Sequence, residues 1–298
     1  MGLPHIELAQ TLELPDGRTA EFETRGVGEP LLWIEGGPGF PAHLARPDVD
    51  LIADRFQCHL VNAPGCGRTN PPTESSGYSL QGHVAFFDDV RATLSLGAVT
   101  VMGHSWGGLV AAAFAAMRPD SVSSLVIIDG YAGERSIPEE LAAAERDRAF
   151  ARVRSRPWFD TALSALERTF DSRGMTEEEF VRMFNDCWPL YFADPDSERS
   201  VGHIARLRRE LRMNKEVSDL WDAGTFEDDV MPLLDRISSP TLIVAGELDF
   251  ICGPVWNRPI ADGIRGARYV EIPDVGHLPQ YEDPQRFRRE LISWADGR

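Results

Sequence analysis

The chain has 298 residues, of which 43% are hydrophobic and 26% charged, and this balance excludes a disordered, collagen-like or coiled-coil protein. Its formal net charge of -17 argues against a nucleic-acid partner, because such a partner needs a basic face. The chain has no apolar run of the roughly 18 residues that span a membrane and no N-terminal secretory signal, so we expect a cytoplasmic protein with no membrane partner.

The first predicted elements form an antiparallel hairpin. Apolar and polar residues alternate over residues 6–14 and again over residues 20–24, with the turn sequence Pro15-Asp16-Gly17 between them. Short apolar runs bounded by glycine or proline follow, and they predict parallel strands buried on both faces. These runs cover residues 31–34, 59–62, 99–102, 125–128, 241–245 and 269–272.

Helical patterns lie between several of these strands, most clearly over residues 79–96 and 107–117. Strands that alternate with helices predict an α/β fold with a mostly parallel, doubly wound sheet. The alternation stops after Gly130, and residues 134–229 have a helical, strongly charged pattern. We therefore expect a helical cap at residues 132–232, inserted between two parts of one core at residues 1–131 and 233–298.

The segment Gly103-His104-Ser105-Trp106-Gly107 joins a predicted strand directly to a predicted helix. This is the context of a G-x-S-x-G nucleophile elbow. The glycines leave room for a strained serine backbone, and the helix N-terminus favours developing negative charge. The motif predicts Ser105 as a nucleophile; the alternative is a capping serine in a glycine-rich turn.

Candidates for the base and acid follow two later strands. Asp249 comes after the strand at 241–245 and His277 after the strand at 269–272, so both stand at the carboxyl edge of the sheet, where sites form. The order Ser, Asp, His is that of the α/β-hydrolase triad. Asp129, after the strand at 125–128, is a rival for the acid because some triads take it from that earlier strand.

An oxyanion hole is predicted from two backbone N–H groups. One belongs to Trp106, which follows the proposed nucleophile. The other comes from the loop after the first parallel strand, Glu35-Gly36-Gly37-Pro38-Gly39, where three glycines allow close approach to a substrate oxygen. We predict Gly37 as the donor.

Four segments resemble the proline iminopeptidase group of the α/β-hydrolase superfamily. They are EGGPG at 35–39, APGCGRTNPP at 63–72, HSWGG at 104–108 and GELDFICGP at 246–254; the first, second and fourth are similar to the HGGPG, QxGxGRS and GRxDxxCP segments of that group. The resemblance implies an α/β-hydrolase fold that cleaves an N-terminal residue, often proline, from small peptides. It also implies that acidic groups of the cap hold the free amine.

The chain also departs from the group. Glu35 replaces the usual His and would either alter the oxyanion loop or place an extra carboxylate near the substrate, and His104 stands where the group usually has Gly. The cap is the least similar part. Cys252 is interpreted as a packing residue. Candidate substrate-binding residues are Glu35, the acidic residues Asp186, Asp194 and Glu198, and the aromatic residues Trp188 and Tyr191.

Together these features predict a serine hydrolase that works through an acyl-enzyme on a small molecule or short peptide. The triad would be Ser105, His277 and Asp249, and the four scattered cysteines predict neither a metal site nor a disulfide. We expect no cofactor. The first expectation is an aminopeptidase like the proline iminopeptidases; the alternatives are a carboxylesterase, lactonase or thioesterase, since all share this machinery, and more remotely a non-catalytic ligand-binding relative.

Overall fold

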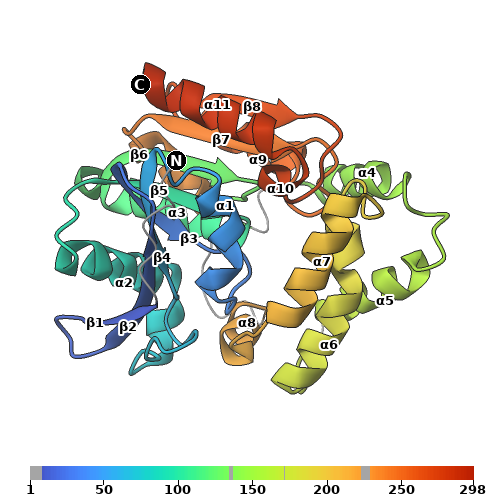
Figure 1. Ribbon diagram of the computed structural model, residues 1–298, viewed down its shortest axis with the longest axis horizontal. Helices are drawn as coiled ribbons and strands as arrows, with labels where there is room; N and C mark the ends of the chain where they lie inside the picture. Colours follow the sequence, from blue (N-terminus) through green and yellow to red (C-terminus); the bar gives the residue numbers. More distant parts are fainter. Residues whose placement is uncertain (1–8, 134–136, 171, 223–228) are drawn as a thin grey trace.

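The computed structural model describes residues 9–133, 137–170, 172–222 and 229–298. Its strands form one twisted sheet in the order β1-β2-β4-β3-β5-β6-β7-β8 (Figure 1). From β4 to β8 the neighbours are parallel, while β1 pairs antiparallel with β2 and β2 with β4. The strands are β1 (Gln10–Glu13), β2 (Thr19–Arg25), β3 (Glu29–Ile34), β4 (Phe56–Val61), β5 (Val99–His104), β6 (Val122–Ile128), β7 (Thr241–Gly246) and β8 (Arg268–Ile272).

The predicted hairpin is present as β1 and β2. The Gly17 N–H donates to the Leu14 carbonyl at 2.9 Å, and Gly17 has a φ of +83°, which a glycine adopts without steric cost. Residues 6–8 of the expected first strand lie outside the described residues.

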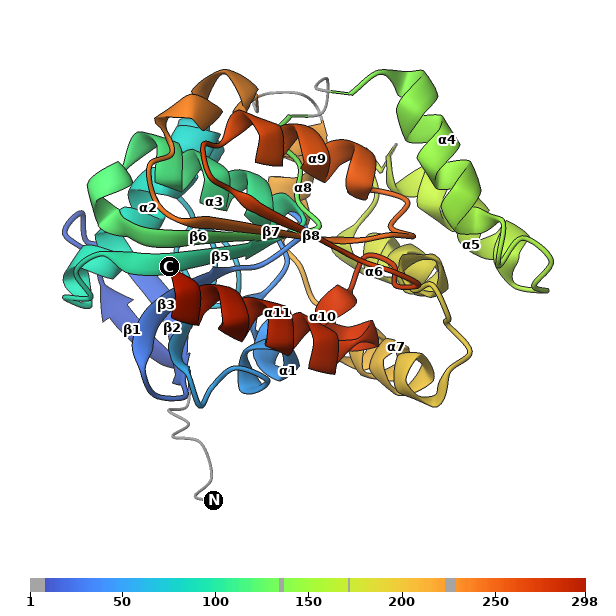
Figure 2. The same ribbon diagram turned by 90° about the horizontal axis from the view of Figure 1, so that it is seen from above.

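Helices cover both faces of the sheet, so the predicted α/β fold is confirmed (Figure 2). On one face lie α2 (Leu80–Thr93), α3 (Trp106–Met117) and α9 (Pro254–Gly263); on the other lie α1 (Arg46–Asp50) and α11 (Pro284–Gly297). Successive residues of a strand point to opposite faces. In β3, Leu32 therefore packs in the apolar cluster of α2 and α3, while Trp33 packs in that of α1 and α11.

The outermost strand β8 does not fit the prediction of strands buried on both faces. Only Ile272 of its five residues is buried. The strand pairs with β7 on one side alone, so its side chains also meet solvent. Arg268 and Glu271 form surface ion pairs with Glu290 and Arg258, which keeps this edge polar.

The chain between β6 and β7 is helical where it is described. The helices are α4 (Glu139–Phe150), α5 (Phe159–Thr169), α6 (Glu177–Cys187), η4 (Trp188–Tyr191), α7 (Glu198–Glu210) and α8 (Lys215–Asp222). Helices α4 to α7 lie beyond the carboxyl edge of the strands (Figure 2) and have an apolar cluster that includes Phe159, Phe184 and Leu207. In contrast, Val217 and Trp221 of α8 pack in the cluster of α3. The boundaries at 132 and 232 stay a prediction.

Short helices complete the described chain. They are η1 (Ala42–Ala45), η2 (Ser75–Tyr78), η3 (Pro119–Ser121), η5 (Met231–Arg236) and α10 (Pro279–Glu282). Within the described ranges, none of the helices combines the length and the apolar character needed to span a membrane.

Candidate active site

Ser105 occupies the turn between β5 and α3 in a strained conformation, with φ 54° and ψ -122°. Its N–H donates to the Ile128 carbonyl at 2.9 Å, and its own carbonyl accepts from the Gly108 N–H at 2.8 Å. A Cβ atom on Gly103 would lie 2.0 Å from the Gly107 carbonyl oxygen, and one on Gly107 would lie 2.1 Å from the Ile34 oxygen. Strand and helix therefore meet so closely here that only glycine fits.

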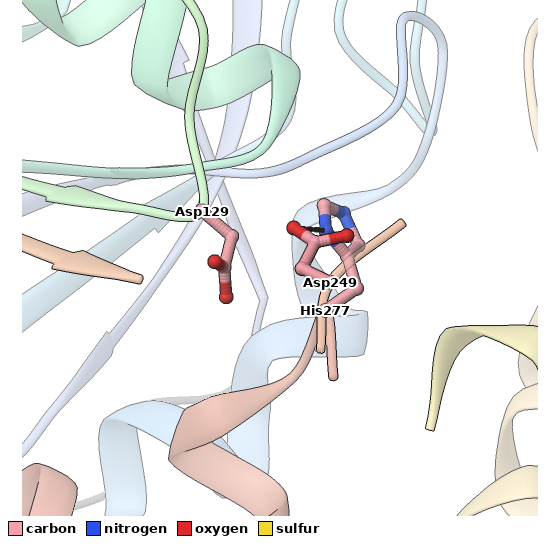
Figure 3. Close-up of side chains that lie close together, drawn as sticks. All are labelled: Asp129, Asp249 and His277. Atoms are coloured by element: carbon pink, nitrogen blue, oxygen red, sulfur yellow. Dashed lines mark hydrogen bonds and ion pairs between the residues drawn. The ribbon is translucent and has the colours of Figure 1, made fainter. Parts of the chain in front are cut away.

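His277 and Asp249 form a buried pair at the same edge of the sheet (Figure 3). The His277 Nδ1 atom lies 2.7 Å from Asp249 Oδ2, and the two side chains are 5% and 0% exposed. Asp249 Oδ1 accepts the Ile251 N–H at 2.9 Å. Of the two acids considered from the sequence, Asp249 is the one whose hydrogen bond orients the imidazole.

Three other segments hold the backbone around His277. His104 Nε2 donates to the His277 carbonyl at 2.8 Å, and burial lowers the pKa of His104 to about 3, so this ring is neutral. The His277 N–H donates to the Tyr191 carbonyl at 2.9 Å. The neighbouring Gly276 N–H donates to the Glu282 carboxylate at 2.6 Å. The His277 loop is therefore tied to β5, to η4 and to α10.

Asp129 lies beside this pair. The hydrogen bond to His277 Nδ1 is made by Asp249 and not by Asp129. One ligand atom from each of Asp129, Asp249 and His277 falls within 4.8 Å of the others, a spacing that could in principle suit a metal ion. However, the direct Asp249–His277 hydrogen bond uses Nδ1, and a metal on that nitrogen would have to break it. The arrangement suits proton transfer better than metal binding.

The predicted oxyanion loop runs against Ser105. A Cβ on Gly36 would lie 3.0 Å from the Ser105 Cβ, and Gly37 has a φ of +70°. Trp106 is the first residue of α3, where a backbone N–H has no acceptor within the helix. Gly37, Trp106 and Ser105 all line one pocket.

That pocket has a volume of about 470 Å³ and also contains His277. Much of its wall is aromatic, from Phe40, Phe180, Phe184, Trp188, Tyr191, Phe250 and Trp256. Glu35 lies in the polar part, where its carboxylate accepts the Trp33 Nε1–H and the Gly36 N–H, both at 3.0 Å. Burial nevertheless raises the pKa of Glu35 to about 7.

The structure brings only part of the predicted substrate-binding set to this pocket. Glu35, Trp188 and Tyr191 line it. The acidic residues Asp186, Asp194 and Glu198 are exposed and lie outside it, because α6, η4 and α7 turn their apolar sides inward.

Four charged residues of the pocket were missed by sequence reasoning, and two of them, Glu139 and Arg146, belong to α4. Asp48 of α1 and Arg206 of α7 both line it, and burial, followed by the nearby Glu35, raises the pKa of Asp48 well above its ordinary value. Arg206 was visible only as part of a charge run, and Asp48 carried no motif.

Cys252 is a buried neighbour of the proposed nucleophile. It lines the same pocket as Ser105, and burial, with the Asp249 charge, raises the pKa of Cys252 well above its ordinary value. A thiol that keeps its proton is a poor nucleophile, which agrees with a packing role.

A family model described as alpha/beta hydrolase fold matches residues 29–284. The chain belongs to this family. Among the relatives of this α/β hydrolase, a putative non-heme bromoperoxidase of Mycobacterium tuberculosis is 24% identical over 92% of this chain and 96% of its own. A proline iminopeptidase of Saccharolobus solfataricus is 22% identical over 92% and 87%. The solved structure of an alpha/beta fold family hydrolase from Bacillus anthracis superimposes with a TM-score of 0.77 at 18% identity, over 97% of this chain and all of that one.

The family membership makes the protein an α/β-fold hydrolase, and it agrees with the sheet described above. The relatives include proline iminopeptidases, as the sequence motifs suggested. At these identities the similarity to solved structures shows the fold alone. The substrate class depends on the residues that line the pocket.

Proposed function

We propose that this hydrolase uses Ser105 as its nucleophile and forms an acyl-enzyme with a small amide or ester. The observation that carries the proposal is the strained Ser105 turn in one pocket with the buried His277–Asp249 pair. A serine hydroxyl is a weak nucleophile and needs a base that is oriented by an acid. His277 and Asp249 have the residue types and the mutual geometry for these roles.

In this mechanism His277 removes the Ser105 proton as the hydroxyl attacks the substrate carbonyl. The backbone N–H groups of Trp106 and Gly37 stabilise the oxyanion. His277 then gives the proton to the leaving group, and Asp249 stabilises the imidazolium through the Nδ1 hydrogen bond. Water hydrolyses the acyl-enzyme by the same steps, so no cofactor is needed.

For the substrate we propose a small amide with a free amine, as an aminopeptidase would take. The proline iminopeptidases among the relatives point in this direction. The pocket supports it with two buried carboxyl groups, Glu35 and Asp48, on a largely aromatic wall. An ammonium group would offset the cost of burying a carboxylate there. We propose these core groups as the anchor, because Glu139, the cap acid that also lines the pocket, is exposed and pairs with Arg146.

A small ester or lactone is the second candidate. The observation in its favour is that the acidic residues expected to hold an amine, Asp186, Asp194 and Glu198, lie outside the pocket. Arg206 adds a positive charge to the polar end, which would oppose an ammonium group and favour an oxygen-rich substrate.

The proposal can be tested with a fluorophosphonate probe and a substrate panel. We expect the probe to label the wild-type protein and Ser75→Ala, a control at an exposed serine outside the pocket, but not Ser105→Ala. Ser105→Ala should also lower kcat by about 10⁴-fold or more. Labelling of Ser105→Ala at the wild-type rate would refute the assignment.

The panel decides between the two substrate classes. Aminoacyl anilides with a free amine are compared with N-blocked anilides and with short esters and lactones. Cleavage of the free-amine anilides alone supports the aminopeptidase. Turnover of esters or lactones supports the second candidate only when no anilide is cleaved, because activated esters react with any exposed activated serine and their turnover alone does not discriminate.

A further inference from the structure

The carboxyl group of Asp129 has no role in the mechanism above, although it lies beside the acid of the proposed triad (Figure 3). Asp129 follows the last residue of β6 and adopts a φ of +41°, which is uncommon for a residue with a side chain. Its N–H donates to the Val244 carbonyl at 2.9 Å, and its Oδ1 accepts the Gly246 N–H at 2.7 Å. Hydrogen bonds to β7 thus hold both its backbone and its side chain.

The other oxygen of Asp129 is the unusual one. Oδ2 is fully buried, and no donor reaches it among the residues that the structure describes. The carboxyl group next to it is that of Asp249, and one oxygen of each group lies within 4.8 Å of the other. An unsatisfied buried oxygen is costly, and two adjacent buried carboxylates repel each other. A single proton between the two groups removes both penalties.

The hydrogen bonds indicate which of the two acids carries that proton. Asp249 accepts an N–H bond on each oxygen, from Ile251 and from His277. Asp129 accepts only one, on Oδ1. Asp129 is therefore the group whose second oxygen, Oδ2, can carry the proton and donate it in a hydrogen bond. Burial and the neighbouring Asp249 also raise the pKa of Asp129 well above its ordinary value.

The groups around Asp129 offer no free cation to change this balance. The titratable groups that interact with it within the described chain are Asp249, Glu282, Cys252 and Tyr269, with His277 also close by. Only His277 can become positive, and its Nδ1 already bonds to Asp249.

We propose that Asp129 is a positioning residue whose protonated carboxyl group donates a hydrogen bond to Asp249. This bond fixes the Asp249 carboxylate for His277. Ketosteroid isomerase provides a precedent for a buried carboxylic acid that stays neutral and donates a hydrogen bond. The inference rests on the proposed serine mechanism.

The test compares Asp129→Ala, Asp129→Asn and Asp249→Asn in the full-length protein. Asparagine tolerates a positive φ and can accept from Gly246 while its amide donates to Asp249, as a protonated Asp129 would. We expect Asp129→Ala to lower kcat by about 10- to 100-fold, as is typical of groups that orient catalytic ligands. Asp129→Asn should restore most of that loss. Asp249→Asn should lower kcat by about 10³- to 10⁴-fold.

Infrared difference spectra of wild type against Asp129→Asn give a readout that does not depend on turnover. We expect the wild type to retain the C=O stretching band of a protonated carboxyl group above neutral pH, and Asp129→Asn to lack it. This comparison stands even if Asp129→Ala fails to fold.

Two results would overturn the inference. One is an Asp129→Asn variant as impaired as Asp249→Asn, which would make Asp129 an ionised acid of the triad. The other is the absence of the carboxyl band from the difference spectrum. Failure of the wild-type protein to react with the fluorophosphonate would instead overturn the proposed function, so the two failures are distinguishable.

Discussion

Glu282 offers a sharp test of how the His277 loop is held in place. Its carboxylate accepts the Gly276 N–H at 2.6 Å and the Ala193 N–H at 2.8 Å, so it joins the His277 loop to the segment after η4. Glu282→Ala would leave these two buried N–H groups without an acceptor. At about 1–3 kcal/mol for each unsatisfied group, we expect a loss of about 2–6 kcal/mol in the free energy of unfolding.

The pH dependence separates this hydrogen-bonding role from simple packing. Burial raises the pKa of Glu282 to about 7, from an ordinary 4.5. The folded chain therefore holds the proton more tightly than the unfolded chain, and stability falls as pH rises from about 4.5 and levels off above about 7. At about 1.4 kcal/mol for each unit of pKa, this group accounts for a decrease of about 3.5 kcal/mol over the whole range.

Glu282→Gln removes the titration and keeps one oxygen acceptor. Urea unfolding between about pH 5 and about pH 8 should show its stability relative to wild type improving by about 3 kcal/mol as pH rises. Glu167→Gln, at an exposed position of α5, is the matched control and should run parallel to wild type. Parallel curves for wild type and Glu282→Gln would refute the reasoning.

Three further predictions concern the turn and the pocket. A Cβ on Gly107 would lie 2.1 Å from the Ile34 oxygen, whereas one on helical Gly202 would meet nothing within 4 Å. Thermal unfolding should therefore show that Gly107→Ala is destabilised by about 1–3 kcal/mol or more and that Gly202→Ala is stabilised by about 1 kcal/mol. Equal effects of the two substitutions would contradict this packing. If Glu35 holds a substrate amine, KM for a free-amine anilide should fall as pH rises through about 7, where the Glu35 carboxyl group ionises. Glu35→Gln should abolish this pH dependence of KM. An unchanged pH dependence in Glu35→Gln would exclude Glu35 as the amine-binding group. In Asp249→Asn, fluorophosphonate labelling should be much slower than in wild type, although peptide mapping should show that Ser105 is intact. Labelling at the wild-type rate would exclude Asp249 as the orienting acid.

Local sequence signals were sufficient for the sheet, and they predicted Ser105, His277 and two alternative acids as catalytic residues. The strands could be predicted because alternating or continuous apolar runs are a property of a few neighbouring residues. Within β3, for example, Leu32 and Trp33 face the two opposite helical layers. The Ser105 turn could be predicted because its glycines are required by contacts within one strand–turn–helix unit and its neighbouring strand.

The choice between Asp249 and Asp129 needed the tertiary structure. Both residues end strands at the same edge of the sheet, so their positions in the sequence are equivalent. The 2.7 Å contact with His277 Nδ1 depends on the loops that follow β7 and β8, and loop conformation is not encoded in strand periodicity.

The pocket wall likewise depended on packing between distant segments. Asp48 and Arg206 reach the pocket from α1 and α7. The acidic residues Asp186 and Glu198 carry the same charge signal in the sequence but face solvent, because the rotation of a helix is set by where its apolar side packs. The sequence by itself determined the sheet and predicted the chemistry of the Ser105 turn, while long-range packing decided which charged side chains line the pocket.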